Sequence, residues 1–417
     1  MGLNLRWVGE DEWDRVAKAR LLCYAYGARE LDSYGERLRA DPRNRGADIV
    51  LADEAEAAGG GGTPVGTATA LPLTLWARGG AVPCQGVAWV GTAKTHRRGG
   101  SKDAPGIATQ VMREVLRRAR ERGQVVSALM PFRASFYEHF GYGLVERRHD
   151  WTLPLDVLPR GDFAGVRFYE PDDFDALVDC RQRIARRGQC DIERPAALWE
   201  LYLRRAEDGF VVVDRPEAAG PVRGWAEFRH SNEGAKAVVR VAEVGYEGVP
   251  DLLRLLHFLA SLKDQYAAAA LTLPADVQLS RLLRETQLPH RPVNHATAEV
   301  RPYTRMQLRV LDHKRFVEAM HLPPDVRGAA AVAVHETEGH VSRLRIEIEG
   351  GRARVTAGDG SPAAFECRDV TWAAVVCGDL PATAAVELGL ATCADRPGAE
   401  LLDAFAVGPA PFTLEYF

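Results

Sequence analysis

One stretch of the chain, from Val87 to Gly143, constrains the fold more than any other. A strand-like apolar run ends in a turn rich in arginine and glycine, and an amphipathic helical pattern follows the turn. A second strand pattern and an aromatic helix–turn segment complete the stretch. The first turn of a helix has N–H groups without intrahelical acceptors and carries the positive end of the helix dipole. The stretch therefore predicts a cradle for an anionic group such as a phosphate.

Length and charge limit the function classes. The chain has 417 residues, which predicts two or three domains, and its 46% hydrophobic and 26% charged residues are ordinary for a soluble globular protein. The net charge of −4 gives no overall attraction to nucleic acid or to an anionic membrane. We interpret the arginine-rich run from Arg113 to Arg122 as the solvated face of a helix. We therefore expect no nucleic-acid partner and no membrane partner.

The cysteines and the N-terminal residues predict in which cellular compartment the protein is located. Seven widely spaced cysteines without a CxxC motif favour reduced thiols over a disulfide framework or a zinc site. Charged residues near the N-terminus leave no apolar signal segment, and no window approaches the roughly 18 apolar residues that a membrane span needs. We expect a cytoplasmic protein without a metal.

The order of predicted elements indicates a duplication. Strand and helix patterns in the first third of the chain predict an α/β layout with a mixed sheet. The order hairpin, strand, turn, helix and strand recurs from Gly209 to Leu273. The second turn, Gly245 to Pro250, has no arginine and includes Glu247, so it should repel a phosphate. From about Arg301 the composition changes again, which predicts a third, small α/β unit.

Three segments carry a resemblance to a known family. They are the run Ala93 to Gly99 (AKTHRRG), the run Tyr137 to Gly143 (YEHFGYG) and the last residue, Phe417. With its flanking strand and helix, the first run resembles the acetyl-CoA site of the GNAT N-acetyltransferase superfamily. Over its whole length the chain resembles the Eis-type (enhanced intracellular survival) acetyltransferases. The fold class that this implies is α/β with mixed sheets. It has a GNAT domain at 1–152, a degenerate GNAT domain at 153–302 and a sterol-carrier-like domain at 303–417.

The resemblance also implies a reaction. A small-molecule primary amine attacks the thioester of acetyl-CoA directly, Tyr137 protonates the leaving thiolate, and the terminal carboxylate of Phe417 takes up the proton of the amine. Some members acetylate aminoglycosides, and the family tends to form hexamers. The residues that would bind acetyl-CoA are Val90, Gly91, Thr92, Arg97, Arg98, Gly99, Gly100 and Gly106.

Elementary chemistry leaves alternatives open for both catalytic candidates. A tyrosine with a pKa of about 10 can donate to a thiolate whose acid has a pKa of about 8.5–9. Tyr137 can instead be a packing aromatic, and Tyr142, its rival, fits a core position better. A terminal carboxyl has a pKa of roughly 3.3–3.7, which only a partly dry cleft would raise toward that of a useful base. The aromatic tail would then anchor the chain end, or it would simply cap the third unit.

Other polar residues are weaker candidates for binding the amine or transferring protons. Glu30, Asp32 and Glu138 can supply negative charge for a cationic amine, but a solvated surface position is the simpler interpretation. His96 and His139 can relay protons, or they can be partly exposed residues beside a turn.

The chain departs from the family pattern at one point. An insert, Gly100 to Pro105, separates the arginine–glycine turn from the helix, and Asp103 has the position expected of an N-cap. A capping carboxylate would compete with a phosphate for the same N–H groups. Two rival functions therefore stay open: a non-catalytic binding or scaffold protein with an impaired cradle, and a carrier of lipid or another apolar ligand through the third unit.

Overall fold

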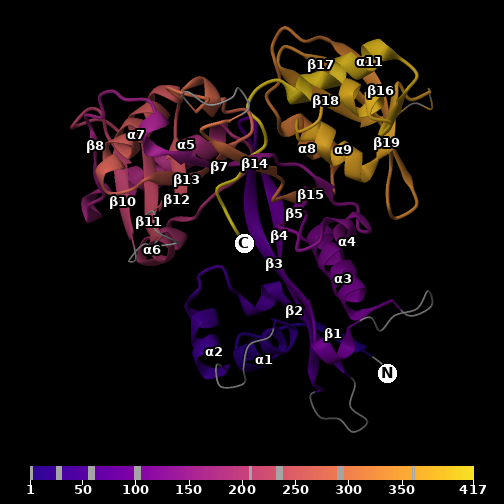
Figure 1. Ribbon diagram of the computed structural model, residues 1–417. Coiled ribbons are helices and arrows are strands. Elements are labelled where there is room, and N and C mark those ends of the chain that lie inside the picture. Colours follow the sequence, from indigo (N-terminus) through magenta and orange to yellow (C-terminus); the bar gives the residue numbers. More distant parts are fainter. Residues whose placement is uncertain are drawn as a thin grey trace.

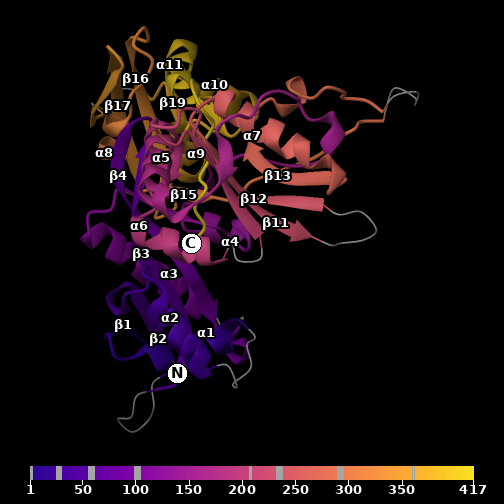
Figure 2. The same ribbon diagram turned by 90° about the vertical axis from the view of Figure 1, so that its left-hand side faces the viewer.

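The computed structural model describes residues 3–24, 31–54, 62–97, 105–205, 209–231, 238–288, 295–358, 360 and 362–417. Its strands form three sheets, which build three lobes around a central junction (Figures 1 and 2). Strands that are distant in sequence join the same sheet, so the lobes share segments. Among the described residues, no helix is long and apolar enough to cross a membrane.

The first sheet has the order β1-β2-β3-β4-β5-β15-β6, with β9 paired to β3. Residues Val50 and Ala52 of β2 pack into the core beneath α3, whereas Ile49 and Leu51 face the core beneath α1 and α2, so helices cover both faces. The strands are β1 (Leu3–Trp7), β2 (Ile49–Glu54), β3 (Pro64–Ala77), β4 (Gly80–Thr92), β5 (Val126–Leu129), β6 (Gly143–Leu144), β9 (Gln189–Ile192) and β15 (Gln307–Val310). The helices are α1 (Trp13–Tyr24), α2 (Leu31–Ala40), α3 (Ile107–Glu121) and α4 (Ala134–Glu138).

The second sheet has the order β14-β7-β13-β12-β11-β10-β8 and repeats the plan of the first. The segment β11-β12-α7-β13 corresponds to β3-β4-α3-β5, which agrees with the predicted duplication. The strands are β7 (Arg148–Pro154), β8 (Val166–Phe168), β10 (Gly209–Asp214), β11 (Gly224–Ser231), β12 (Val238–Tyr246), β13 (Ala268–Pro274) and β14 (Glu299–Tyr303). The helices are α5 (Phe174–Arg187), α6 (Ala196–Arg205) and α7 (Val249–Ser261).

The third sheet has the order β18-β17-β16-β19-β20. Gly350 and Gly351 have φ angles of 56° and 76°, which permit the tight hairpin between β17 and β18. The strands are β16 (Gly328–His335), β17 (Val341–Glu349), β18 (Arg352–Ala357), β19 (Phe365–Arg368) and β20 (Ala391–Cys393). The helices are α8 (His313–Ala319), α9 (Asp369–Val376), α10 (Ala382–Glu387) and α11 (Arg396–Leu402).

Helix α3 begins just after the insert, close to the predicted position, but its N-cap differs from the one predicted. It starts at Ile107 with Gly106 as its N-cap, and no side chain of the described residues caps it. The expectation that Asp103 is the N-cap is therefore wrong, and Asp103 itself lies outside the described residues. The buried face of the helix fixes its position on β3 and β4 and consists of Ile107, Val111, Met112, Val115, Leu116 and Ala119.

The C-terminal tail does not cap the third lobe. After α11 it leaves that lobe and runs to the junction between the first two sheets, where the chain ends beside β3 and β4 (Figure 1). The Phe412 amide donates to the Gln189 carbonyl over 3.0 Å, and the Thr413 amide donates to the Glu146 carboxylate over 3.0 Å. The tail thus joins all three lobes.

Candidate active site

Strands β4 and β5 separate at one end and open the first sheet. They pair in parallel only from Cys84 to Val87, opposite Val126 to Leu129. Beyond that point β4 continues to Thr92, with a bulge relative to β3 where Trp89 has a φ of 54°. A non-glycine residue in this left-handed region is uncommon, and bulges of this kind redirect strands next to functional sites. The predicted residues Val90, Gly91 and Thr92 therefore line an edge that has lost its partner strand.

The start of α3 lies directly against this edge. A Cβ at Gly66 of β3 would come within 2.4 Å of the Ile107 side chain, so the first turn of the helix packs closely on the sheet. Gly106 has no side chain, and no side chain of the described residues caps this turn, so among these residues nothing occupies its N–H groups and an anion could bind them. The Thr92 hydroxyl is also buried and has no hydrogen-bond partner among the described residues. These features fit a phosphate-bearing ligand that enters along β4.

Only part of the arginine–glycine turn belongs to the described residues. The guanidinium of Arg97 donates to the Cys23 carbonyl over 2.9 Å, which holds this side chain at the end of α1. Gly106 is the N-cap of α3. Arg98, Gly99, Gly100 and most of the insert lie outside the described residues.

A cavity of about 470 Å³ extends along the open edge. It brings together Val90 of β4, Tyr137 of α4 and the terminal residue Phe417, which are far apart in the sequence. Further aromatic side chains complete its walls, together with the pair Asp41 and Arg43. The aromatic residues are Tyr24, Trp89, Phe132, Tyr202 and Tyr416.

Tyr137 is one of the tyrosines that line this cavity. Its side chain is 4% exposed and packs edge-on against Phe132 and Phe136, with ring centroids 5.7 and 5.0 Å apart. Among the described residues its hydroxyl makes no hydrogen bond, and burial raises the pKa of Tyr137 above its ordinary value. A raised pKa keeps the phenol protonated, as a proton donor requires.

Tyr142 is a core residue. Its side chain is fully buried, its hydroxyl lies 2.7 Å from the Ser127 hydroxyl, and burial raises the pKa of Tyr142 to about 12. It does not line the cavity.

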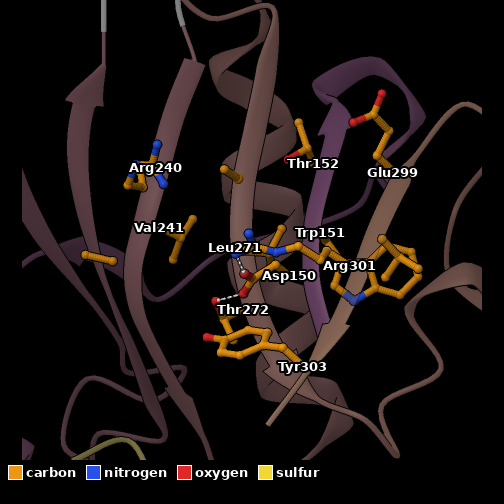
Figure 3. A pocket seen from close by; sticks show the side chains of 13 residues that line it. Asp150, Trp151, Thr152, Arg240, Val241, Leu271, Thr272, Glu299, Arg301 and Tyr303 are labelled. Atoms are coloured by element: carbon orange, nitrogen blue, oxygen red, sulfur yellow. Dashed lines mark hydrogen bonds and ion pairs between the residues drawn. The ribbon is translucent and has the colours of Figure 1, made fainter. Parts of the chain in front are cut away.

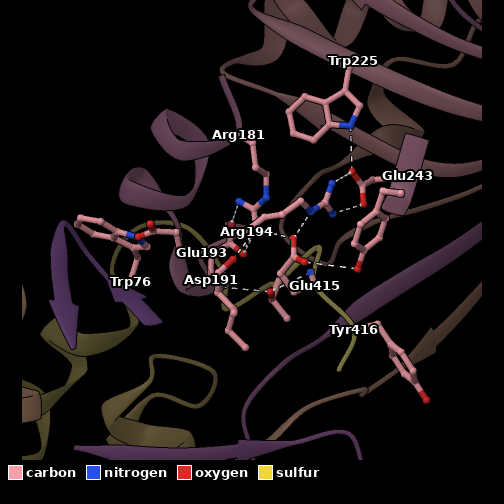
Figure 4. A network of polar contacts seen from close by, with 12 residues as sticks. Trp76, Arg181, Asp191, Glu193, Arg194, Trp225, Glu243, Glu415 and Tyr416 are labelled. Carbon is pink, nitrogen blue, oxygen red and sulfur yellow. Dashed lines mark hydrogen bonds and ion pairs between the residues drawn. The ribbon is translucent and has the colours of Figure 1, made fainter. Parts of the chain in front are cut away.

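The chain end is held by buried ion pairs (Figure 4). The Glu415 carboxylate accepts a hydrogen bond from Arg194 over 2.7 Å and lies 3.5 Å from Arg181. Each arginine also has its own carboxylate partner, Glu243 for Arg194 and Asp191 for Arg181. Two residues further on, the Phe417 ring lies over the backbone of Gly86, where an added Cβ would be 2.9 Å from the ring. The tail is therefore fixed on β4 within the cavity.

The other polar candidates from the sequence do not line the cavity, or lie outside the described residues. Glu138 is exposed and does not line the cavity, while Glu30 and the side chain of Asp32 lie outside the described part of the chain. His96 Nε2 lies 3.6 Å from Glu54, and His139 Nδ1 lies 2.7 Å from the Ser135 carbonyl. The residues that sequence reasoning missed are Tyr24, Asp41, Arg43 and Tyr202, for which no motif gave a signal.

In the second sheet, the space beside β12 that corresponds to the open edge of β4 is filled by a side chain. A Cβ at Gly245 would lie 2.2 Å from the Trp225 ring, so that indole occupies the space beside β12. Glu247 pairs with Arg183, Arg187 and Arg223, and Asp251 in the first turn of α7 pairs with Arg254. The second turn therefore carries carboxylates that are neutralised within the protein.

A different pocket, of about 480 Å³, lies on the second sheet between β12, β13, β7 and β14 (Figure 3). Asp150 accepts hydrogen bonds from Thr272 and Arg301, each over 2.7 Å. This pocket contains neither Tyr137 nor the chain end. No group of three or more metal-ligating side chains occurs among the described residues.

The sequence of this chain is similar to known acetyltransferases. Residues 4–145 match one family described as an acetyltransferase (GNAT) domain, and residues 190–310 match a second family with the same description. An uncharacterized N-acetyltransferase of Streptomyces avermitilis is 26% identical over 354 residues, which cover 79% of this chain and 77% of that protein. The N-acetyltransferase Eis of Mycobacterium tuberculosis is 25% identical over 335 residues, 76% of each chain.

Solved structures show the same fold over the full length. A GCN5-related N-acetyltransferase from Anabaena variabilis has a TM-score of 0.82 at 15% identity, with full coverage of both chains. Eis1 from Mycobacterium abscessus has a TM-score of 0.77 at 19% identity, also with full coverage of both chains.

The chain thus carries tandem GNAT domains in a mixed α/β fold, and it is an N-acetyltransferase. It is similar to the Eis acetyltransferases, and acetyl-CoA is the co-substrate that GNAT acetyltransferases use.

Proposed function

We propose that this chain transfers the acetyl group of acetyl-CoA to a primary amine within the cavity along β4. The observation that carries the proposal is that the open edge of β4, Tyr137 and Phe417 line one cavity. Acetyl-CoA would supply an activated thioester. The residues around it would align the amine, accept its proton and return a proton to the leaving sulfur.

Tyr137 fits the role of the general acid. As the new C–N bond forms and the C–S bond breaks, the electron pair of that bond passes to sulfur, and the phenol would donate its proton there. The raised pKa of Tyr137 keeps the phenol protonated until the thiolate forms. Tyr137 would regain a proton from solvent through the cavity.

Phe417 fits the role of the base through its terminal carboxylate. The anchored Glu415 and the ring on Gly86 leave this carboxylate little freedom, and a fixed group loses less entropy when it acts. Arg43 donates to the Tyr416 carbonyl over 3.0 Å and holds the preceding peptide from the side of α2. The carboxylate would take the proton that the amine loses during attack.

A second cavity, of about 710 Å³, fits the nucleotide end of acetyl-CoA. It begins at Thr109 in the first turn of α3 and continues past Arg113 to Arg309 and Glu338. Arg113 is exposed and has no partner among the described residues, whereas Arg309 is paired with the Glu338 carboxylate over 3.2 Å. Arg113 is therefore the cation that favours the phosphate groups of the ligand.

Titration of the protein with acetyl-CoA tests this placement. We expect one binding site per chain, because Trp225 and the paired Glu247 fill the second cradle. Arg113→Ala should raise the Kd about 5- to 10-fold, as loss of one charge-assisted contact predicts. Arg117→Ala is the matched control, since that residue lies on the same helix but pairs with Glu114. Two sites per chain, or equal effects of both variants, would contradict the placement.

The function itself is tested by release of free thiol from acetyl-CoA when a primary amine is added. We expect amine-dependent release together with the N-acetylated amine in the products. Failure of acetyl-CoA at millimolar concentration to raise the Tm would instead support the non-catalytic alternative, since a ligand at about 100 times its Kd stabilises a protein by about 2.7 kcal/mol. A sterol-carrier-like third domain, domain limits at residues 152 and 302, a hexamer and a cytoplasmic location stay predictions.

A further inference from the structure

The end of helix α1 lies directly against the open edge of β4. A Cβ at Gly91 would be 2.7 Å from the Cβ of Cys23, so the helix and the strand are in close contact there. One turn earlier on the same helix, Arg20 is fully buried and faces the same strand. The Arg97 guanidinium donates to the Cys23 carbonyl over 2.9 Å. The last turn of α1 therefore contacts both β4 and the arginine–glycine turn.

Trp89 has the unusual backbone conformation of this edge. Its φ of 54° belongs to the left-handed region, which a large side chain adopts only where its surroundings hold it. The register of β3 against β4 shifts at this point, between Thr67 and Thr69. Because the peptide that follows Trp89 turns with the backbone of that residue, the conformation of Trp89 determines where the Val90 N–H group points.

Two side chains of α1 hold Trp89 and its neighbour. The Arg20 guanidinium lies 4.5 Å from the centre of the Trp89 ring, and its Nη2 donates to the Thr69 hydroxyl over 2.9 Å. Tyr24 packs edge-on against the same ring, with ring centroids 5.5 Å apart, and its hydroxyl donates to the Val90 carbonyl over 2.7 Å. A cation over an indole ring is attracted most strongly where both are removed from water. Arg20 thus fixes the side chain of the bulge, and Tyr24 fixes the backbone that follows it.

The position of Arg20 is unfavourable for a charged side chain. Burial lowers the pKa of Arg20, because desolvation disfavours the charged form. An apolar side chain of similar length would fill the same space without this cost. A specific contact that only a cation can make explains the arginine better than packing does, and the contact with the Trp89 ring is of this kind.

We infer that Arg20 and Tyr24 are positioning residues, which hold the bulge at Trp89 and so orient the edge of β4 toward acetyl-CoA. The inference rests on the proposed acetyl transfer and adds residues that act on it through Trp89 and the backbone of β4. The N–H groups of this edge would stabilise the charge that develops on the acetyl oxygen, and such donors are effective when they are aligned in advance. Loss of the α1 contacts should therefore impair catalysis more than it impairs binding of the nucleotide end at α3.

Hydrogen exchange of the ligand-free protein tests the positioning without the reaction. In Arg20→Met the amides of residues 89–92 should exchange about 10-fold faster, because the bulge opens more often without the cation. Arg20→Lys keeps a cation at the ring and should restore much of the protection. Val16→Ala is the matched control, since Val16 lies on the same helix but in the core shared with α2. It should lower the Tm without selective exchange at β4.

A double-mutant cycle separates positioning from a general loss of stability. Arg20→Met should lower kcat about 10- to 100-fold and leave the Kd of CoA nearly unchanged, since misplacement of aligned groups by about 1 Å can cost this factor. Trp89→Gly permits the same φ angle without strain. In the Trp89→Gly background, Arg20→Met should therefore lower kcat further by less than about threefold, because the contact that it removes is already absent.

Tyr24→Phe is a second variant that keeps the ring contact and removes only the hydroxyl. It should lower kcat about 5-fold, the usual net value of one hydrogen bond, and it should increase exchange at Val90. This variant tests the same inference if Arg20→Met does not fold.

The outcomes separate this inference from the proposed function. If Arg20→Met leaves the exchange of residues 89–92 unchanged, or lowers kcat by the same factor with and without Trp89→Gly, Arg20 is not a positioning residue and the acetyl transfer stands. If Arg20→Met does not fold and Tyr24→Phe changes neither quantity, the inference is equally wrong. If no amine releases thiol although acetyl-CoA binds, the proposed function fails, and hydrogen exchange still decides whether α1 holds the bulge.

Discussion

Replacing Tyr137 with phenylalanine is expected to lower kcat by about 10²- to 10⁴-fold, the usual contribution of a positioned proton donor. The Kd of acetyl-CoA should change little, because the ring and its packing against Phe132 and Phe136 are kept. Rapid-mixing measurement of thiol release, together with titration of acetyl-CoA, separates the two quantities.

The pH profile gives a second test of the same residue. Burial raises the pKa of Tyr137, so the phenol stays protonated up to and beyond its ordinary pKa of about 10. Activity should therefore show no fall due to this group below about pH 10.

Tyr142→Phe is the matched control for Tyr137→Phe. Tyr142 shares a hydrogen bond with Ser127 in the core, so its loss should cost about 1 kcal/mol of unfolding free energy and leave kcat nearly unchanged. Full activity of Tyr137→Phe combined with an inactive, folded Tyr142→Phe would reverse the assignment.

Two additional residues after Phe417 are expected to lower kcat by about 100-fold or more. The extension turns the terminal carboxylate into a peptide carbonyl and carries the new carboxylate away from the amine. The same two residues at the N-terminus provide the control. Steady-state kinetics should show the loss in kcat for the C-terminal extension only, with the Kd of acetyl-CoA kept.

Gly86→Ala, a substitution far from the chain end in sequence, independently tests the role of the Phe417 carboxylate. The Phe417 ring lies against Gly86, and a Cβ there would approach the ring to 2.9 Å and the Leu73 side chain to 2.4 Å. Gly86→Ala should therefore displace the ring and lower kcat, because misplacement of a catalytic group by about 1 Å can cost about 100-fold. If the extended chain and Gly86→Ala both keep full activity, the terminal carboxylate is not the base.

Local sequence patterns predicted the parts of the fold that local physics determines. The amphipathic pattern after the arginine–glycine turn appears as helix α3, with its apolar residues buried. The duplication was also visible, because the order of elements is a property of the sequence. The N-cap at Asp103 was predicted wrongly, since a short polar residue before Pro105 resembles a cap whether or not the helix begins there.

Only part of the site could be predicted in the same way. The motif around Tyr137 and the aromatic chain end were recognisable, but nothing local placed them in one cavity. That depends on the tail crossing from the third lobe to Glu146 and Gln189, which are more than 200 residues earlier in the chain. Asp41, Arg43 and Tyr202 reach the cavity through the packing of different units, so no spacing rule identifies them.

The most direct test of the account is a crystal structure of the protein with acetyl-CoA. We expect the pyrophosphate at the first turn of α3 and the thioester sulfur within about 3.5 Å of the Tyr137 hydroxyl, directly or through one water. The Phe417 carboxylate should lie on the opposite side of the acetyl carbon. A thioester located elsewhere, for example in the pocket beside Asp150, would contradict the central claim.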